Sequence, residues 1–274
     1  MIAGPVIGAY PATMNSEEAF NWPNGDVILR STDGSDSRDF RLHKPILSLA
    51  SPAFRDTFSP PRPSSPPLDF DIVDVEDPPR AVELTLRFIY PCPPPKIDDL
   101  TLLSEALAFA DNYDIESARS QLRPSLMAFA ETESLRVCAI ACRFGCVEEM
   151  KRASSYTTSI HLPGLAKLPD EFRFIPAAEY DRLTLLHARY RKEFEAIALS
   201  GRVWFSDSPT FFGTVVGAIK LKYALPVIMG GTPLNYESLA LAWTREYGVD
   251  ADTSGVGKIF RSILDKVNAL NLTV

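Results

Sequence analysis

Three cysteines at helical spacing are the first side chains in this sequence that could carry chemistry. Cys138, Cys142 and Cys146 stand four residues apart, so on a helix they share one face, as ligands of a metal ion would. A structural zinc site takes four ligands, normally paired on tight turns, and no fourth cysteine or histidine lies near them in the sequence. We therefore predict buried thiols that act as small hydrophobic side chains, and no metal or other cofactor.

The run Gly255-Val256-Gly257-Lys258 hints at a phosphate-binding loop. The complete motif requires glycine five positions before Gly257 and serine or threonine after the lysine, but Asp252 and Ile259 stand there. No predicted strand precedes the run. We interpret Ser254 and Gly255 as the start of the last helix and predict no nucleotide site.

Histidines and paired carboxylates are the remaining candidates for acid–base chemistry. His43, His161 and His187 are the histidines of the chain, and no nucleophile signature surrounds them. His187 lies on an otherwise apolar helix face, which favours a hydrogen-bonded core residue. The pairs Asp98-Asp99 and Glu148-Glu149 are sequence neighbours, which diverge by about 100° on a helix and favour a solvated face. No catalytic residue is predicted.

Composition limits the classes of partner and of architecture. Of 274 residues, 23 are proline, and sixteen of these lie at or before Pro95, which predicts short elements there and longer helices afterwards. The formal net charge of −7 argues against nucleic acid as the main partner, because binding phosphates needs surplus lysine and arginine. Four cysteines do not make a disulfide framework, and residues 1–14 lack a basic signal-peptide start. We expect an intracellular protein, with nucleus and cytoplasm both open.

One apolar segment, Phe211 to Met229, raises the question of a membrane span. Lys220 and Lys222 lie in its middle, and Pro226 breaks it. A central lysine costs about 3 kcal/mol on insertion scales. The segment is therefore predicted to be a buried helix, and no membrane partner is expected.

The elements expected before Pro95 are short. Strands at 26–30 and 40–42 form a hairpin around a turn at 31–37, and a third strand with alternating apolar residues runs from Leu68 to Val75. Helices are expected at 45–50, at 52–58 with Ser51 as the N-cap, and at 79–90. Residues 59–67 contain five prolines and are expected to form a solvated loop.

Longer helical patterns fill the rest of the chain. The first are at 100–110, 115–126, 135–144 and 147–153, with a bend at Gly145, and a proline-punctuated connection follows from Ser154 to Ala178. Four further stretches are expected at 180–197, 212–219, 236–247 and 256–270. The predicted fold class is α+β at first and all-α afterwards.

Several blocks of the first half together resemble the BTB/POZ domain family. Residues 25–29 and 40–54 are similar to the start of that family, which reads D-V and then F-x-x-H-K/R-x-(I/V)-L-x-x-x-S-x-x-F. Residues 72–77, 88–90 and 106–115 resemble its later strand and helix ends in the right order. The run 46–52 is similar to a large fungal, basidiomycete-type group of these proteins. The resemblance implies a small sheet capped by helices, commonly in a homodimer.

The resemblance also suggests a division of the chain. We expect an N-terminal arm at 1–23, a BTB/POZ-like domain at 24–129, paired helices at 130–153, a linker at 154–178 and a helical C-terminal domain at 179–274.

Four residues are candidates for the dimer interface. Asp26 and Lys44 match a charged pair near the family's dimer groove, and His43 matches a histidine that is usually structural. Leu47 and Leu49 are the apolar candidates, because so small a sheet cannot bury every apolar side chain of the neighbouring helices.

The loop at 59–67 bears on two further hypotheses. BTB adaptors of cullin-class ubiquitin ligases usually carry a hydrophobic-x-acidic element in this place, and the loop here has no acidic residue. Ser59 and Ser65 each precede a proline and are candidate phosphorylation sites, the alternative being an insertion without a role.

The function expected from the sequence is a non-enzymatic interaction scaffold. It self-associates through the BTB-like domain and recruits an unidentified protein through its helical C-terminal half. A cullin adaptor is the first alternative, with a cullin as partner, and an enzyme with a site in the C-terminal half is the less favoured one.

Overall fold

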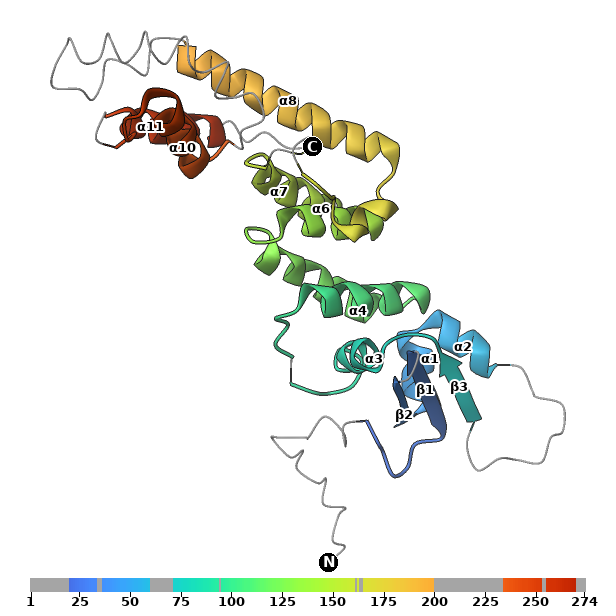
Figure 1. The fold of residues 1–274 in the computed structure, drawn as a ribbon. Helices are drawn as coiled ribbons and strands as arrows, with labels where there is room; N and C mark the ends of the chain where they lie inside the picture. Colours follow the sequence, from blue (N-terminus) through green and yellow to red (C-terminus); the bar gives the residue numbers. More distant parts are fainter. Residues whose placement is uncertain are drawn as a thin grey trace, which may run out of the picture. The chain divides into compact units, whose positions relative to one another are not determined.

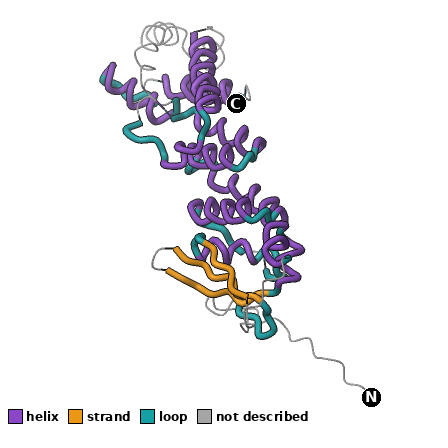
Figure 2. Tube along the Cα trace, turned by 90° about the vertical axis from the view of Figure 1, so that its right-hand side faces the viewer, coloured by secondary structure: helices purple, strands orange, loops and turns teal. Residues whose placement is uncertain are grey.

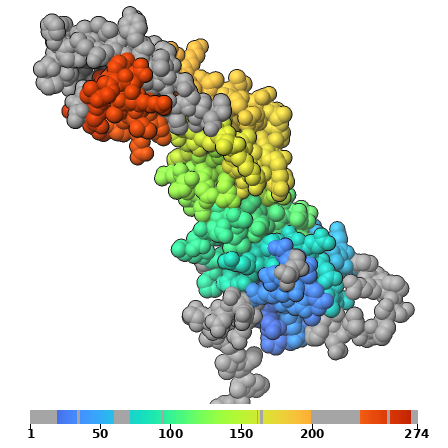
Figure 3. All heavy atoms as spheres, viewed as in Figure 1, coloured from blue at the N-terminus to red at the C-terminus, as the bar shows by residue number. Residues whose placement is uncertain are grey.

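The computed structural model describes residues 20–33, 36–59, 71–93, 95–160, 162, 165–199, 234–252 and 255–269. Internal contacts divide the chain into two units, one ending at Ser125 and the next beginning at Leu126, and each is described by itself. Figure 1 labels their elements, and Figure 3 shows the packed atoms in the same sequence colours.

A mixed three-stranded sheet forms one layer of the first unit. β1 (Val27–Asp33) pairs antiparallel with β2 (Asp36–Leu42) and parallel with β3 (Asp71–Val75), in the order β2-β1-β3 (Figure 1). Figure 2 shows the strands side by side in orange. Alternate residues of β1 are buried, as the hairpin prediction required.

The predicted turn at 31–37 was wrong in extent, because the strands continue through most of it. The ladder extends to the pair Asp33–Asp36. Ser31 is buried and donates through Oγ to the carbonyl of Asp77 at 2.5 Å, and Arg30 pairs with Asp39 across the hairpin at 2.8 Å. These contacts outweigh the turn-forming composition of the segment.

Helices form the rest of this unit. They are α1 (Lys44–Ala50), α2 (Pro52–Phe58), α3 (Pro79–Leu86), α4 (Leu100–Asn112) and α5 (Glu116–Leu122), and the 3₁₀ segment η1 (Arg123–Phe129) follows. α3 packs against β1 and β2, α4 packs on α3, and α1 packs on α2. The prediction for α2 is confirmed at its cap, because the Ser51 hydroxyl accepts from the Phe54 N–H at 3.0 Å. The helix predicted to reach Tyr90 ends at Leu86, where the N–H groups of Phe88 and Ile89 turn to carbonyls three residues back.

The core of the first unit lies between the sheet and these helices. Its largest fully buried side chains come from both layers: Leu29, Phe40, Leu42, Leu47, Phe54, Leu86, Leu100, Leu103, Leu107 and Phe109. The predicted α+β first part is confirmed.

The second unit is helical throughout its described residues. Its elements are α6 (Ser134–Arg143), α7 (Val147–Thr157), η3 (Asp170–Phe174), α8 (Ala177–Leu199), α10 (Tyr236–Tyr247) and α11 (Val256–Asn268). α6 and α7 form the predicted hairpin, and Gly145 between them has φ of +63°, a value that favours glycine. α11 packs against both α8 and α10. The helix predicted at 212–219 lies outside the described residues.

α7 continues four residues beyond its predicted end at Ala153. Ser154 and Thr157 are buried, and the hydroxyl of each donates to the carbonyl three residues back, so their polar groups are satisfied inside the helix. The polar composition of this stretch had indicated a connection instead.

No helix within the described ranges is long and apolar enough to cross a membrane. The apolar segment from Phe211 to Met229 lies outside those ranges.

Candidate functional site

Asp26 is held where the sheet meets the first helix. It directly precedes β1, and its N–H donates to the carbonyl of Leu42, the last residue of β2, at 2.9 Å. Gly25 permits this close approach, because a Cβ at that position would lie 2.7 Å from the same carbonyl oxygen. The Asp26 carboxylate therefore lies beside the first turn of α1.

Asp26 caps α1 from a different element. His43 occupies the N-cap position but makes no side-chain capping bond, whereas Oδ1 of Asp26 accepts from the Lys44 N–H at 2.7 Å. A carboxylate at this end of a helix also interacts favourably with the helix dipole. Asp26 and Lys44 are thus in contact, but through the lysine backbone.

The Lys44 ammonium pairs with Asp71 on β3. Val27 and Asp71 are partners in the parallel ladder, so Asp26 and Asp71 mark the same end of the sheet, with Lys44 joined to both. We call Asp26, Lys44 and Asp71 the acid–lysine–acid cluster. The Lys44 and Asp71 side chains keep 31% and 39% of their surface exposed, so water reaches this pair.

The two leucines predicted for the dimer interface face opposite ways. Leu47 is 0% exposed and belongs to the core, whereas Leu49 is 85% exposed. Residues two positions apart on a helix do not share a face. Leu49 is therefore the leucine of α1 whose side chain reaches solvent.

His43 lies in an aromatic cluster. Its N–H donates to the Tyr90 hydroxyl at 3.0 Å, and its Nε2 is 3.2 Å from Oδ1 of Asn24. The Trp22 and Tyr90 rings stack with centroids 5.9 Å apart. Burial raises the pKa of Tyr90 to about 12, so its hydroxyl stays neutral as a hydrogen-bonding partner. These contacts indicate a structural role for His43.

Comparison with known proteins identifies this region. Residues 20–128 match a sequence model of the BTB/POZ domain family. This segment of the chain is a BTB/POZ domain. The BTB domain is a non-catalytic protein-interaction module, and such domains commonly dimerise and bind partners. No curated protein matches the chain.

The match to the BTB family begins at Phe20. Phe20 is buried, and its ring meets Tyr90 edge to face, with centroids 5.7 Å apart. Residues that the sequence assigned to an N-terminal arm thus pack onto the BTB domain.

The serine candidates lie at and after the end of α2. Ser59 is exposed at the C-cap, and its hydroxyl donates to the carbonyl of Arg55 at 2.7 Å. Ser65 lies outside the described residues.

The cysteines are free thiols with different environments. Cys138 and Cys146 are buried and Cys142 is half-buried. Burial raises the pKa of Cys138 to about 12. Within the described ranges, no three histidine, cysteine, aspartate or glutamate side chains are grouped as metal ligands would be.

The other sequence candidates occupy structural positions. His187 is buried with Nε2 3.0 Å from the Thr157 hydroxyl, which confirms it as a hydrogen-bonded core residue. Gly255 is the N-cap of α11 in a left-handed conformation, and Asp99 caps α4 by accepting from the Thr101 N–H at 2.8 Å. Glu148 is exposed at the start of α7. His161 lies outside the described residues.

Proposed function

We propose that this chain is a non-enzymatic intracellular scaffold that self-associates through α1 of its BTB domain and recruits a protein partner through its helical second unit. The observation that carries the proposal is Leu49, a large apolar side chain left 85% exposed on a helix of a known interaction module. A single exposed leucine is common on protein surfaces. Its place on a helix of the BTB domain is what gives it weight.

The energetics favour Leu49 over the charged cluster as the source of affinity. Burying a leucine contributes about 1.5–3 kcal/mol, and a two-fold interface buries two copies, about 3–6 kcal/mol together. Desolvating the Lys44–Asp71 pair would offset its own attraction. The cluster is therefore not the source of affinity in the proposed interface.

Analytical ultracentrifugation of the full chain tests self-association. Leu49→Ser should weaken the dimer by about a hundredfold or more, which is the loss of both buried leucines. Leu241→Ser is the matched control, because Leu241 is 71% exposed on α10 of the second unit. A wild-type chain that stays monomeric at concentrations on the order of tens of micromolar, or equal dimerisation in both variants, contradicts the proposal.

A cullin adaptor is the second candidate function. The α6–α7 hairpin that follows the BTB domain favours it, since paired helices often follow the BTB domain in this family. The sequence of residues 59–67, with five prolines and no acidic residue, opposes it. A pull-down with a cullin N-terminal domain decides between them, and recovery of the chain at stoichiometric amounts would favour the adaptor.

Ser59 and Ser65 are proposed as phosphorylation sites of the scaffold. A phosphate on Ser59 would bring negative charge to the C-terminal end of α2 and remove the hydroxyl bond to Arg55, so it should loosen the last turn of that helix. Phosphopeptide mapping of the native protein tests both sites.

A further inference from the structure

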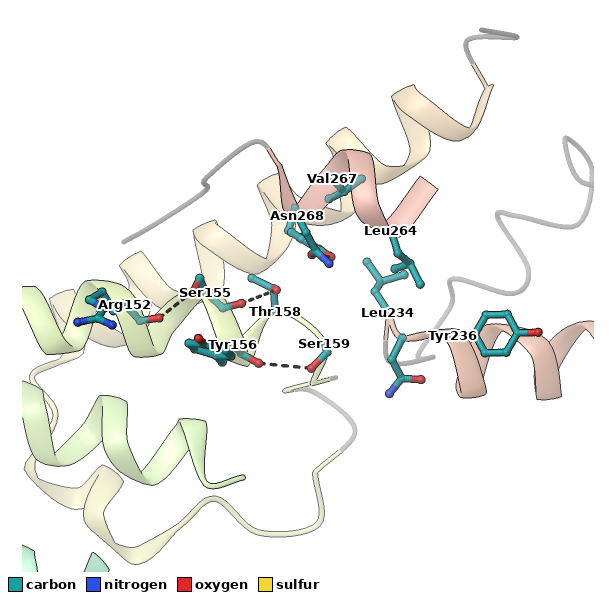
Figure 4. Close-up of a pocket in the computed structure, with 12 residues that line it drawn as sticks. Arg152, Ser155, Tyr156, Thr158, Ser159, Leu234, Tyr236, Leu264, Val267 and Asn268 are labelled. Carbon is teal, nitrogen blue, oxygen red and sulfur yellow. Dashed lines mark hydrogen bonds between the residues drawn. The ribbon is translucent and has the colours of Figure 1, made fainter. Parts of the chain in front are cut away.

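A pocket of about 640 Å³ opens inside the second unit (Figure 4). It lies among the last turn of α7, the middle of α8, the start of α10 and the end of α11. Ligand pockets in proteins span about 300–1,000 Å³ and combine an apolar surface with a few placed polar groups. This pocket has both.

Both apolar and polar residues line the pocket. Figure 4 shows Tyr156, Thr158 and Ser159 together with Leu234, Leu264 and Asn268. Leu234, Leu264 and Val267 are almost wholly buried behind the pocket, whereas Tyr156 is 42% exposed. An apolar side chain of a ligand would therefore lie against the Tyr156 ring.

Hydrogen bonds already made inside the unit determine which polar atoms remain for a ligand. Oδ1 of Asn268 accepts from the Tyr190 hydroxyl at 2.8 Å, and Oδ1 of Asn235 accepts from the Ser238 N–H at 2.8 Å. Each asparagine therefore keeps its NH₂ group as a donor for a ligand.

Other lining residues offer acceptors. The hydroxyls of Ser155 and Thr158 donate to carbonyls three residues back at 2.7 and 2.8 Å, and Ser159 donates likewise at 3.3 Å. The protons of Ser155 and Ser159 are thus engaged, so their hydroxyl oxygens remain as acceptors for a ligand, whereas Thr158 is buried and also hydrogen-bonds to Tyr190. A pocket lined by both donors and acceptors matches an extended peptide, whose backbone presents both C=O and N–H groups.

The charges of the lining residues limit which peptides can bind. Among the described residues that line the pocket, none is acidic, and Arg152 carries the single positive charge at one end. These described residues offer no carboxylate to a cationic side chain, so they disfavour a lysine- or arginine-rich segment.

We propose that this pocket binds an extended, neutral or acidic peptide segment of a partner protein, with one apolar side chain against Tyr156 and a backbone carbonyl on the Asn268 amide. The inference rests on the proposed function, since it names the chemistry of the partner that the second unit would recruit.

Selection of a phage-displayed library of random peptides of about 12 residues on the full-length chain tests this, followed by fluorescence anisotropy with the enriched peptides. Ser155→Trp fills the pocket from an exposed helix position. Asn268→Asp keeps the acceptor for Tyr190 but replaces the NH₂ donor with an oxygen. Glu148→Trp places the same bulk on α7 away from the pocket and is the matched control.

The expected result is enrichment of uncharged or acidic peptides with an apolar residue. Ser155→Trp and Asn268→Asp should each weaken their binding about tenfold or more, and Glu148→Trp should leave it unchanged. No enrichment, equal affinity in all four proteins, or tighter binding by Asn268→Asp overturns the inference. Ultracentrifugation of the same proteins separates the two proposals, because dimerisation without peptide binding refutes the pocket alone, and peptide binding by a monomer refutes self-association alone.

Discussion

Removing the Asp26 carboxylate tests whether that residue works as a helix cap or as a charge. In the structure its Oδ1 accepts from the Lys44 N–H at 2.7 Å, and His43 supplies no side-chain cap. Losing such a cap costs about 0.5–2 kcal/mol, typically about 1 kcal/mol. A free-energy loss of about 1 kcal/mol changes an equilibrium about fivefold, because 1.4 kcal/mol corresponds to a factor of ten. Asp26→Ala should therefore raise the population of locally opened α1 about fivefold.

Amide hydrogen exchange followed by mass spectrometry measures this opening segment by segment. Peptides covering α1 should exchange about fivefold faster in Asp26→Ala, whereas peptides covering α6 in the second unit serve as the internal reference. Asp26→Asn keeps a side-chain oxygen as acceptor and loses only the interaction of the charge with the helix dipole, about 0.3–1 kcal/mol. Asp26→Asn should therefore speed exchange in α1 less than Asp26→Ala does.

The comparison of these two substitutions decides the role of Asp26. If Asp26→Asn speeds exchange in α1 as much as Asp26→Ala, the charge and not the capping bond matters, and the reasoning is refuted. Lys44→Met removes the ammonium but keeps the backbone N–H that Asp26 caps. It should leave the first turn of α1 protected.

Two further predictions follow from shifted pKa values. With a pKa of about 12, the Cys138 thiol is only about one part in ten thousand thiolate at pH 8. Iodoacetamide should therefore modify the half-buried Cys142 and Cys92 first. Equal modification rates of these cysteines and Cys138 in the folded chain would contradict the burial of Cys138. Hydrogen bonding to Arg30 lowers the folded-state pKa of Asp39, so the ion pair stabilises the fold above about pH 4 and the stabilisation is lost as pH falls through the folded value. Urea unfolding should show Asp39→Asn less stable than wild type at pH 7 and the difference shrinking in acid; a pH-independent difference would oppose this.

The short helices near the sheet were predictable because their punctuation is local. Pro45 and Pro52 fit first turns, and Ser51 caps the second helix through its own side chain. The bend between α6 and α7 was predictable for a similar reason, because Gly145 alone supplies the positive φ that the bend needs. Structural signals that depend on only a few neighbouring residues can be identified from the sequence alone.

The contacts of the acid–lysine–acid cluster were not predictable in full. Alternation indicated the third strand, but no local pattern states that it runs parallel to β1 with Val27 opposite Asp71. The partner of the Lys44 ammonium depends on that register. By contrast, the opposite directions of Leu47 and Leu49 follow from helical periodicity, so the sequence did contain that signal.

The structural duties of the cluster determine which variants can test self-association. Asp26 caps α1 and Lys44 ties α1 to β3, so a substitution at Asp26 can loosen the helix that carries Leu49, and one at Lys44 can shift the intact helix relative to β3. A dimer lost in such a variant would not show that the residue touches a partner subunit. Leu49 is 85% exposed within its own protomer, and replacing it leaves the core side chains of α1, Leu47 above all, in place. Replacing Leu49 would therefore remove mainly contacts with a partner subunit. A change in oligomeric state in a Leu49 variant can for this reason be assigned to the interface itself.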